Sequence, residues 1–356
     1  MQSLSQMGRP SRLGARRWHF GLLVVCGCGT LGDGVPPPDE WPRTPLRGFV
    51  LRNLESPLLI EKAGFDLDAP TLEPDPSMPS LRVFGQLWPR NQPTKSQLFA
   101  VTLKNLDDQK SPDELFAATQ PWEGQGLSNP VWLPGGLGVD FPSPLLFYQG
   151  SDGSVGVMWR QPAGDLVRLS QPLVVASDLT PGKLGRVSPV LFSGRLRLYF
   201  TVDDSSLRYA EADASSVALF LHRPSASVRF VSGPALLTAA DFTVAVSRSQ
   251  QVPAERLGAV FVRSVLTPAG RPRYDLYGRA EAMGKTALVA ASSYRGDASE
   301  PFLPIADPLL AVTAGGVPGS PTVSESGGIS ILWLGLRTVA SGIAVAVQQK
   351  DLPPKS

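Results

Sequence analysis

The chain has 356 residues, 33 of them basic and 31 acidic, and its only cysteines are Cys26 and Cys28. This near balance of charge excludes the basic footprint of a nucleic-acid-binding protein. Two cysteines this close to the N-terminus also exclude a disulfide framework in the rest of the chain, whose stability must then come from packing. His222 is the only histidine besides His19, which excludes zinc sites built from several histidines, and we expect neither a metal nor a cofactor.

Residues 1–27 have the order of a bacterial secretory signal. An apolar run over residues 20–25 follows a segment that lacks acidic residues and contains four arginines, Arg9, Arg12, Arg16 and Arg17. The run is shorter than the roughly 20 apolar residues that cross a bilayer, so it is typical of a signal peptide. Its removal with the four arginines leaves 29 basic and 31 acidic residues, a formal net charge of −2. Translation from Met7 would only shorten the basic segment.

The sequence Val25-Cys26-Gly27-Cys28 resembles the bacterial lipobox, in which an aliphatic residue and small residues precede the cysteine that receives the lipid. We therefore expect an exported lipoprotein of the cell envelope, anchored to the membrane through Cys28. Gly29 stands where an aspartate commonly retains lipoproteins at the inner membrane, which favours the outer membrane. The alternative is a buried N-terminal strand with two chance cysteines.

The rest of the chain divides into a tether and one domain. Residues 28–46 are rich in glycine and proline, a composition that suits a flexible tether and equally an ordinary disordered N-terminus. No polar linker interrupts residues 47–356, so we expect them to form a single domain.

Short strands are predicted throughout this domain. Apolar residues alternate with polar ones and are interrupted by clusters of Gly, Pro, Asp and Ser, for example at residues 196–200, with a hairpin turn expected at residues 203–206. The best helix start is Ser111-Pro112-Asp113-Glu114, where we expect only a turn or two. His222 is expected at the end of a strand. The fold class is therefore predicted to be all-β.

An internal repeat refines this prediction. A Ser-Pro pair, an apolar strand, a glycine turn and an aromatic second strand recur from Ser143, Ser188 and Ser320, with weaker copies near Ser80 and Glu255. The spacings leave room for about five units of four-strand size, and radial repetition of such units makes a β-propeller. A sandwich or a propeller with more blades could share the pattern.

Residues 140–212 give this repeat its clearest form, and they resemble a blade of the five-bladed propellers of furanosidase-like and arabinanase-like glycoside hydrolases. The resemblance implies acidic residues at the blade entrances, because glycoside cleavage needs one carboxyl to protonate the leaving oxygen and another to attack or to activate water. Asp140 is the first candidate, and Glu255 and Glu300 are the others. The entrance at residues 185–189 instead carries Arg186, a candidate ligand-binding residue, and no set of three acids matches the repeat. Asp140 can also be read as a turn or capping residue.

The segment from residue 121 to residue 144 carries Trp122 and Trp132 among glycine turns. An aromatic platform of this kind would suit a sugar ring, although tryptophans in β-domains also serve as core plugs. The sequence therefore predicts a non-catalytic propeller module that binds a partner, a glycan or an envelope protein. The alternative is a glycoside hydrolase of the furanosidase-like type, with Asp140 as base or nucleophile and Glu255 or Glu300 as acid.

Overall fold

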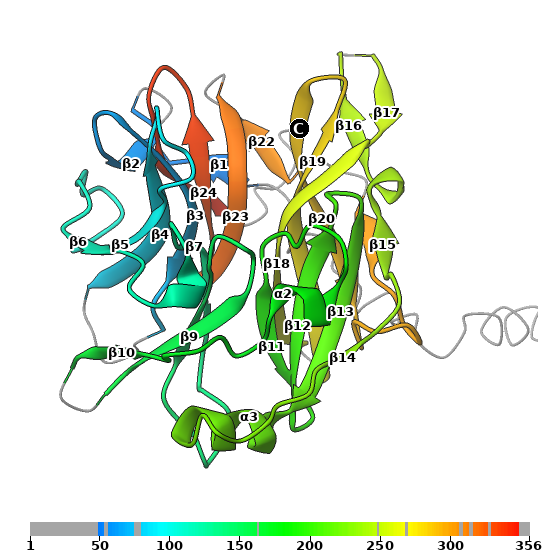
Figure 1. Cartoon of the computed structure of the whole chain (residues 1–356). Helices are drawn as coiled ribbons and strands as arrows, with labels where there is room; N and C mark the ends of the chain where they lie inside the picture. Colours follow the sequence, from blue (N-terminus) through cyan, green and yellow to red (C-terminus); the bar gives the residue numbers. More distant parts are fainter. Residues whose placement is uncertain are drawn as a thin grey trace, which may run out of the picture. The chain divides into compact units, whose positions relative to one another are not determined.

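Strands dominate the part of the chain that the structure describes (Figure 1). The computed structural model describes residues 49–52, 56–74, 80–161, 164–247, 249–267, 270–305, 309–312, 316–326 and 329–348. The predicted signal peptide and the whole predicted tether, Cys28 included, lie outside these residues. The strands form five mainly antiparallel sheets of four to six strands and one separate two-stranded sheet.

The first three sheets, called blades 1 to 3, follow one another in chain order. Blade 1 has the order β3-β4-β5-β6, at Phe65–Leu72, Leu81–Pro89, Gln97–Leu103 and Glu114–Phe116. Blade 2 has the order β7-β8-β9-β10, at Ser128–Leu133, Leu145–Gln149, Val155–Arg160 and Leu166–Arg168. Blade 3 has the order β11-β12-β13-β14, with β15 also paired to β13, at Ser188–Phe192, Arg195–Val202, Ser206–Asp213, Val231–Ser232 and Leu237–Thr238.

Blade 4 is regular, whereas blade 5 takes strands from both ends of the domain. Blade 4 has the order β18-β19-β20-β21, at Arg256–Leu266, Pro272–Ala282, Lys285–Ser293 and Leu303–Ile305. Blade 5 combines β23, β24 and β25 (Val317–Ser326, Ile329–Arg337 and Ser341–Gln348) with β1, β2 and β22 (Phe49–Leu51, Leu58–Glu61 and Leu310–Val312). Because β1 pairs with β25, with Phe49 opposite Gln348, the first described strand closes the last blade.

The first strands of the five blades line a common axis. Each of β3, β7, β11, β18 and β23 contacts the next one, and β23 contacts β3 again. This ring confirms the predicted five-bladed β-propeller and the all-β fold class.

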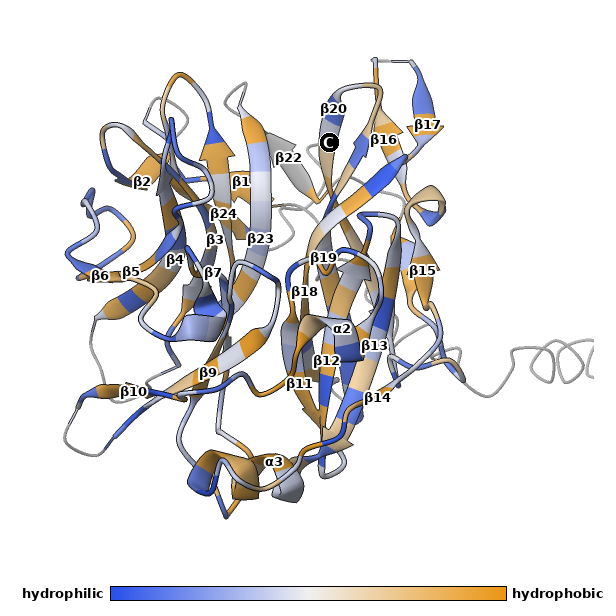
Figure 2. Ribbon diagram, viewed as in Figure 1, coloured by the Kyte–Doolittle hydropathy of each residue, from blue (hydrophilic) through white to orange (hydrophobic). Residues whose placement is uncertain are grey.

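The hydrophobic core is divided among the gaps between neighbouring blades. Five clusters of buried side chains fill the gaps between blades 2 and 3, 3 and 4, 4 and 5, 5 and 1, and 1 and 2. Strand β8 is covered on both faces by neighbouring blades, so every one of its residues is buried. In β13, buried residues instead alternate with partly or fully exposed ones. Figure 2 shows hydrophobic segments along the strands of the blades.

The described residues contain few helices, and the structure differs from two predictions about helix and strand. The short ones are α2 (Ala176–Leu179), η1 (Pro121–Glu123) and η2 (Ala239–Asp241), the last of which precedes the hairpin β16–β17 (Thr243–Ala245 and Gln251–Pro253). The predicted helix at residues 111–114 is wrong, because residues 114–116 pair with β5 as the edge strand of blade 1. His222 is the last residue of α3 (Ala214–His222), not a strand end, because Val217, Phe220 and Leu221 of this helix pack onto the core between blades 2 and 3.

The predicted repeat holds in three of its five copies. Ser188 begins β11, Ser320 lies in β23, and Glu255 directly precedes β18, all of which are inner strands. Ser80 and Ser143 instead precede β4 and β8, the second strands of their blades. The inner strands there carry prolines of their own, at Pro70 in β3 and Pro130 in β7.

Candidate functional site

A buried arginine occupies the centre of the ring. Arg186 lies just before β11 and is 1% exposed. Its Nη1 donates to the carbonyl oxygen of Pro321 at 2.8 Å, and its Nη2 donates to the carbonyl oxygens of Pro130 and Pro70 at 2.9 and 3.1 Å and to Thr322 Oγ1 at 3.0 Å. One side chain therefore joins the inner strands of blades 1, 2 and 5 to the entry of blade 3.

The electrostatics of Arg186 fit this buried position. Burial lowers its pKa to about 10, and the nearby Asp68 carboxylate opposes this shift. The four oxygens to which it donates hydrogen bonds are neutral. Hydrogen bonds to several such oxygens offset the desolvation of a buried cation. Arg186 therefore has a structural role, in which it holds the inner strands together at the axis.

The backbone around Arg186 departs from regular strand geometry. The pairing register shifts between Asp68 and Thr71 in β3 and between Pro318 and Pro321 in β23. Ala69 has a φ of 50° and Asn129 a φ of 54°, both in the left-handed region that most residues avoid. These irregularities lie beside the prolines whose carbonyl oxygens accept hydrogen bonds from Arg186. The inner strands therefore depart from regular pairing at the positions where their carbonyl oxygens bind this side chain.

The carboxylate of Asp68 lies near Arg186. It accepts hydrogen bonds from the backbone N–H of Ser320 at 2.8 Å and from Ser320 Oγ at 3.1 Å. A Cβ atom at Gly319 or Gly335 would lie 2.4 or 2.2 Å from its Oδ1. Two glycines of blade 5 thus leave the space that the carboxylate of blade 1 fills.

A small cavity opens beside Asp68, between blades 1, 4 and 5. Its volume is about 80 Å³, and its charged lining residues are Asp68, Arg279 and Arg337. We call this space the axial cavity. Arg279 reaches it by crossing Gly258 of β18, where a Cβ atom would lie 3.1 Å from the arginine Nε. Ligand pockets commonly measure about 300 Å³ or more, so the axial cavity admits a small group but not a whole sugar ring.

The charges of the axial cavity limit its chemistry. Cleavage of a glycoside needs two carboxyl groups roughly 5 to 10 Å apart. Asp68 is the one carboxylate among the described residues that line this space, and the other two charged side chains are arginines. A single acid can orient a ligand, but it cannot act as proton donor and as base or nucleophile in the same step.

The three acids predicted from the sequence lie apart from the axial cavity. Asp140 is exposed in the connection from β7 to β8, beyond the end of the inner strand, and its carbonyl oxygen lies 3.1 Å from His222 Nε2. Its predicted place at a blade entrance is therefore wrong, since Ser143 belongs to the second strand of blade 2. Glu255 does stand at an entrance, before β18, but its side chain is exposed and its backbone N–H donates to the Glu281 carbonyl.

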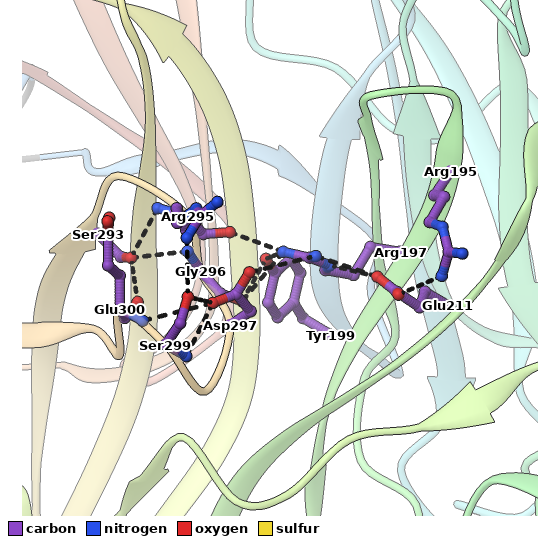
Figure 3. A network of polar contacts seen from close by, with 10 residues as sticks. All are labelled: Arg195, Arg197, Tyr199, Glu211, Ser293, Arg295, Gly296, Asp297, Ser299 and Glu300. Atoms are coloured by element: carbon purple, nitrogen blue, oxygen red, sulfur yellow. Dashed lines mark hydrogen bonds and ion pairs between the residues drawn. The ribbon is translucent and has the colours of Figure 1, made fainter. Parts of the chain in front are cut away.

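Glu300 belongs to a polar network between blades 3 and 4 (Figure 3). It lies between β20 and β21, and its carbonyl oxygen accepts a hydrogen bond from Ser293 Oγ at 2.6 Å. At the centre of the network, Arg197 binds Glu211 Oε2 at 3.0 Å and the carbonyl oxygen of Arg295 at 2.7 Å. These contacts connect β12 and β13 of blade 3 to the loop between β20 and β21, so the network joins the two blades.

The two predicted sugar-binding tryptophans pack in the core. Trp132 is 5% exposed in the cluster between blades 1 and 2, and its ring meets Phe84 edge to face at a centroid distance of 5.3 Å. Trp122 packs against the same cluster, with its ring centroid 5.7 Å from that of Tyr148. These positions favour the core-plug alternative for both.

Sequence reasoning did not select Asp68, Arg279 and Arg337. A usable signal existed for Asp68, because Asp68-Ala69-Pro70 has the same position in blade 1 as Ser128-Asn129-Pro130 has in blade 2. The two arginines had none, since they come from second strands of blades 4 and 5.

Two further findings apply to the part of the chain that the structure describes. It contains no group of three or more His, Cys, Asp or Glu side chains placed to hold a metal ion. None of its helices combines the length and the hydrophobicity that a membrane crossing requires.

Several solved structures similar to this one are named as arabinan- or arabinofuranoside-cleaving enzymes. An endo-arabinase from Bacteroides thetaiotaomicron superposes with a TM-score of 0.56 at 13% identity, covering 83% of this chain and 98% of its own. An α-L-arabinofuranosidase from Podospora anserina, in complex with cellotriose, gives 0.57 at 11% identity, covering 86% and 98%. The catalytic domain of an arabinofuranosidase from Coprinopsis cinerea gives 0.55 at 10% identity, covering 85% and 97%.

The likeness is one of fold. No protein-family model and no curated protein matches the sequence. TM-scores of 0.55 to 0.57 support a shared propeller fold. Identities of only 10 to 13% carry no chemistry, which must be argued from the residues at the axis.

Proposed function

We propose that this propeller binds a saccharide at the mouth of the axial cavity and does not cleave it. The observation that carries the proposal is the charge set there, one carboxylate on Asp68 with the guanidinium groups of Arg279 and Arg337. The fold supports the saccharide as ligand class, because the solved structures similar to it are named as arabinan- and arabinofuranoside-cleaving enzymes. The charge set supports binding without turnover.

Glycoside hydrolysis is the second candidate, and the names of the similar structures favour it directly. For this chain to cleave a glycoside, Asp68 would have to serve as base or nucleophile, and a second carboxyl would have to reach the scissile bond. Glu255 is the predicted acid that stands nearest to an inner strand in the sequence, directly before β18.

Binding and turnover can be separated on one panel of substrates. The purified domain is incubated with arabinan, xylan, fructan and aryl-furanosides, and both bound saccharide and released reducing ends are measured. We expect binding to at least one polymer without release. Turnover that disappears in Asp68→Asn or Asp140→Asn would establish the hydrolase instead.

We further propose that the domain is displayed on the cell envelope by a lipid on Cys28, which lies outside the described residues. The support is the order of residues 1–27 and the sequence Val25-Cys26-Gly27-Cys28. A tethered binding module at the outer membrane would hold a polymer, or an envelope protein carrying one, close to the cell.

A further inference from the structure

The charges around the axial cavity contain more positive than negative groups. Glu281 lies 3.0 Å from Arg279, and Asp66 is shared between Arg90 at 3.2 Å and Arg337 at 3.5 Å. Asp68 is bound by the N–H and hydroxyl of Ser320 and lies in the field of the buried Arg186. Of these groups, Asp68, Arg279 and Arg337 line the cavity, so two arginines face one carboxylate there, and Asp66 nearby has two cationic partners.

The two arginines of the axial cavity also have unused capacity to donate hydrogen bonds. The Nε atom of Arg279 is buried and has no hydrogen-bond partner among the described residues. The Arg337 side chain is 61% exposed, and its ion-pair partner Asp66 lies 3.5 Å away. A guanidinium group in this state is ready to bind an oxyanion, because planar carboxylates match its fork of N–H groups.

The size of the cavity says which part of a ligand can enter. Its volume of about 80 Å³ is well below the roughly 300 Å³ or more of common ligand pockets, so a group as small as a carboxylate enters but a sugar ring does not. Gly319 and Gly335 line the cavity, and the Asp68 carboxylate already fills the space that a Cβ atom would take there.

We propose, on the basis of the saccharide binding argued above, that the ligand is an acidic saccharide, and that one carboxylate of it enters the axial cavity and binds Arg279 and Arg337. The sugar ring stays outside, at the mouth. The repulsion from Asp68 is reduced, because its oxygens already accept two hydrogen bonds and the Arg186 cation lies nearby. The site thus recognises the charge of the ligand inside the cavity and the shape of the sugar ring at its mouth.

The test compares two forms of one polymer that differ only in charge. Oligomers of polygalacturonate and the same oligomers fully methyl-esterified are titrated into the domain at about 0.15 M salt, and binding is measured by calorimetry. We expect the acidic form to bind at least about 10-fold more tightly, as a charge-assisted hydrogen-bonded pair allows. Arg279→Gln and Arg337→Gln should each remove most of this preference for the acidic form.

Arg195→Gln is the matched control, since this half-exposed arginine of blade 3 pairs with Glu211 and should leave the preference intact. Arg337 is largely exposed, so its variant should fold even if the Arg279 variant does not. Equal binding of the acidic and esterified forms, or a preference that survives both arginine variants, would overturn the acidic ligand while leaving saccharide binding in place. Failure to bind these oligomers and every neutral polymer of the panel would instead overturn the proposed function itself.

Discussion

Arg186 donates a hydrogen bond from Nη2 to the carbonyl oxygen of Pro130 at 2.9 Å, and this bond ties the entry of blade 3 to the inner strand of blade 2. The same side chain bonds to Pro70 and Pro321, so three blades depend on it. A propeller without covalent cross-links needs such contacts at its axis, where the inner strands present backbone acceptors to one another.

Replacing Arg186 with methionine should therefore destabilise the domain strongly. The change removes the guanidinium donor from the carbonyl oxygens of Pro130 and Pro321, whereas Pro70 keeps the Thr322 hydroxyl at 2.6 Å. Each buried acceptor that is left unsatisfied costs about 1 to 3 kcal/mol. Urea unfolding of the variant gives the loss directly. Arg195→Met, which removes a half-exposed arginine paired with Glu211, should cost no more than about 1 kcal/mol. Equal stability of the two variants would show that Arg186 does not hold the inner strands together.

The fit of Asp68 against blade 5 predicts a steric effect at Gly335. A Cβ atom there would lie 2.2 Å from Asp68 Oδ1, whereas the nearest atom to a Cβ at Gly278 lies at 3.5 Å. Gly335→Ala should lose about 1 to 3 kcal/mol of stability, and Gly278→Ala should lose much less. Combining Gly335→Ala with Asp68→Ala should recover part of the loss, which a double-mutant cycle measures. Strict additivity would mean that the two residues do not compete for this space.

Buried tyrosines predict the response to alkali. Burial raises the pKa of Tyr148, Tyr199 and Tyr277 above its ordinary value. An unfolded chain releases these protons near pH 10, while the folded chain keeps them, so stability is full below about pH 10 and falls as the pH rises further. The lowered pKa of Arg186 acts in the opposite direction, but as one group against three.

Thermal unfolding between about pH 8 and pH 11.5, together with phenolate absorbance, checks this expectation. Part of the absorbance change should appear only as the protein unfolds. Complete titration of the tyrosines near pH 10, in a protein that stays folded, would contradict it.

The N-terminal prediction is tested by the location of the protein in a bacterial host. The full chain should partition into the detergent phase and the membrane fraction, because a lipid on Cys28 adds apolar surface. Cys28→Ala should move the protein to the aqueous phase, and Cys26→Ala is the control that leaves cleavage and lipidation in place. Unchanged partitioning of Cys28→Ala would rule out the anchor.

The fold was accessible from the sequence because it depends on local signals that repeat. Alternating strands, glycine turns and recurrent Ser-Pro pairs are each readable within about ten residues, as at residues 196–200. The turn predicted at residues 203–206 is also confirmed, since Asp203 and Asp204 both have positive φ values and connect β12 to β13. Helix α3 was missed because its run of Val, Leu and Phe suits a strand equally well when its packing partner is unknown.

The axial cavity was not accessible in this way, because its residues meet only when the ring closes. The position of Asp68 depends on the absence of side chains at Gly319 and Gly335, which no local pattern links to it. Arg186 was predicted to bind a ligand. An arginine at a blade entrance can bind either a ligand or the protein's own carbonyl oxygens, and three other strands decide which. Trp122 and Trp132 illustrate the same limit, since their surroundings decide between a platform and a core plug.

A crystal structure of the domain with an oligosaccharide from the panel above tests the central claim most directly. We predict an intact oligosaccharide at the mouth of the axial cavity, in contact with Arg279 and Arg337 and next to Asp68. A saccharide bound elsewhere, for instance along residues 121–144, would contradict the proposed site. A cleaved product held between Asp68 and a second carboxyl would contradict binding without turnover.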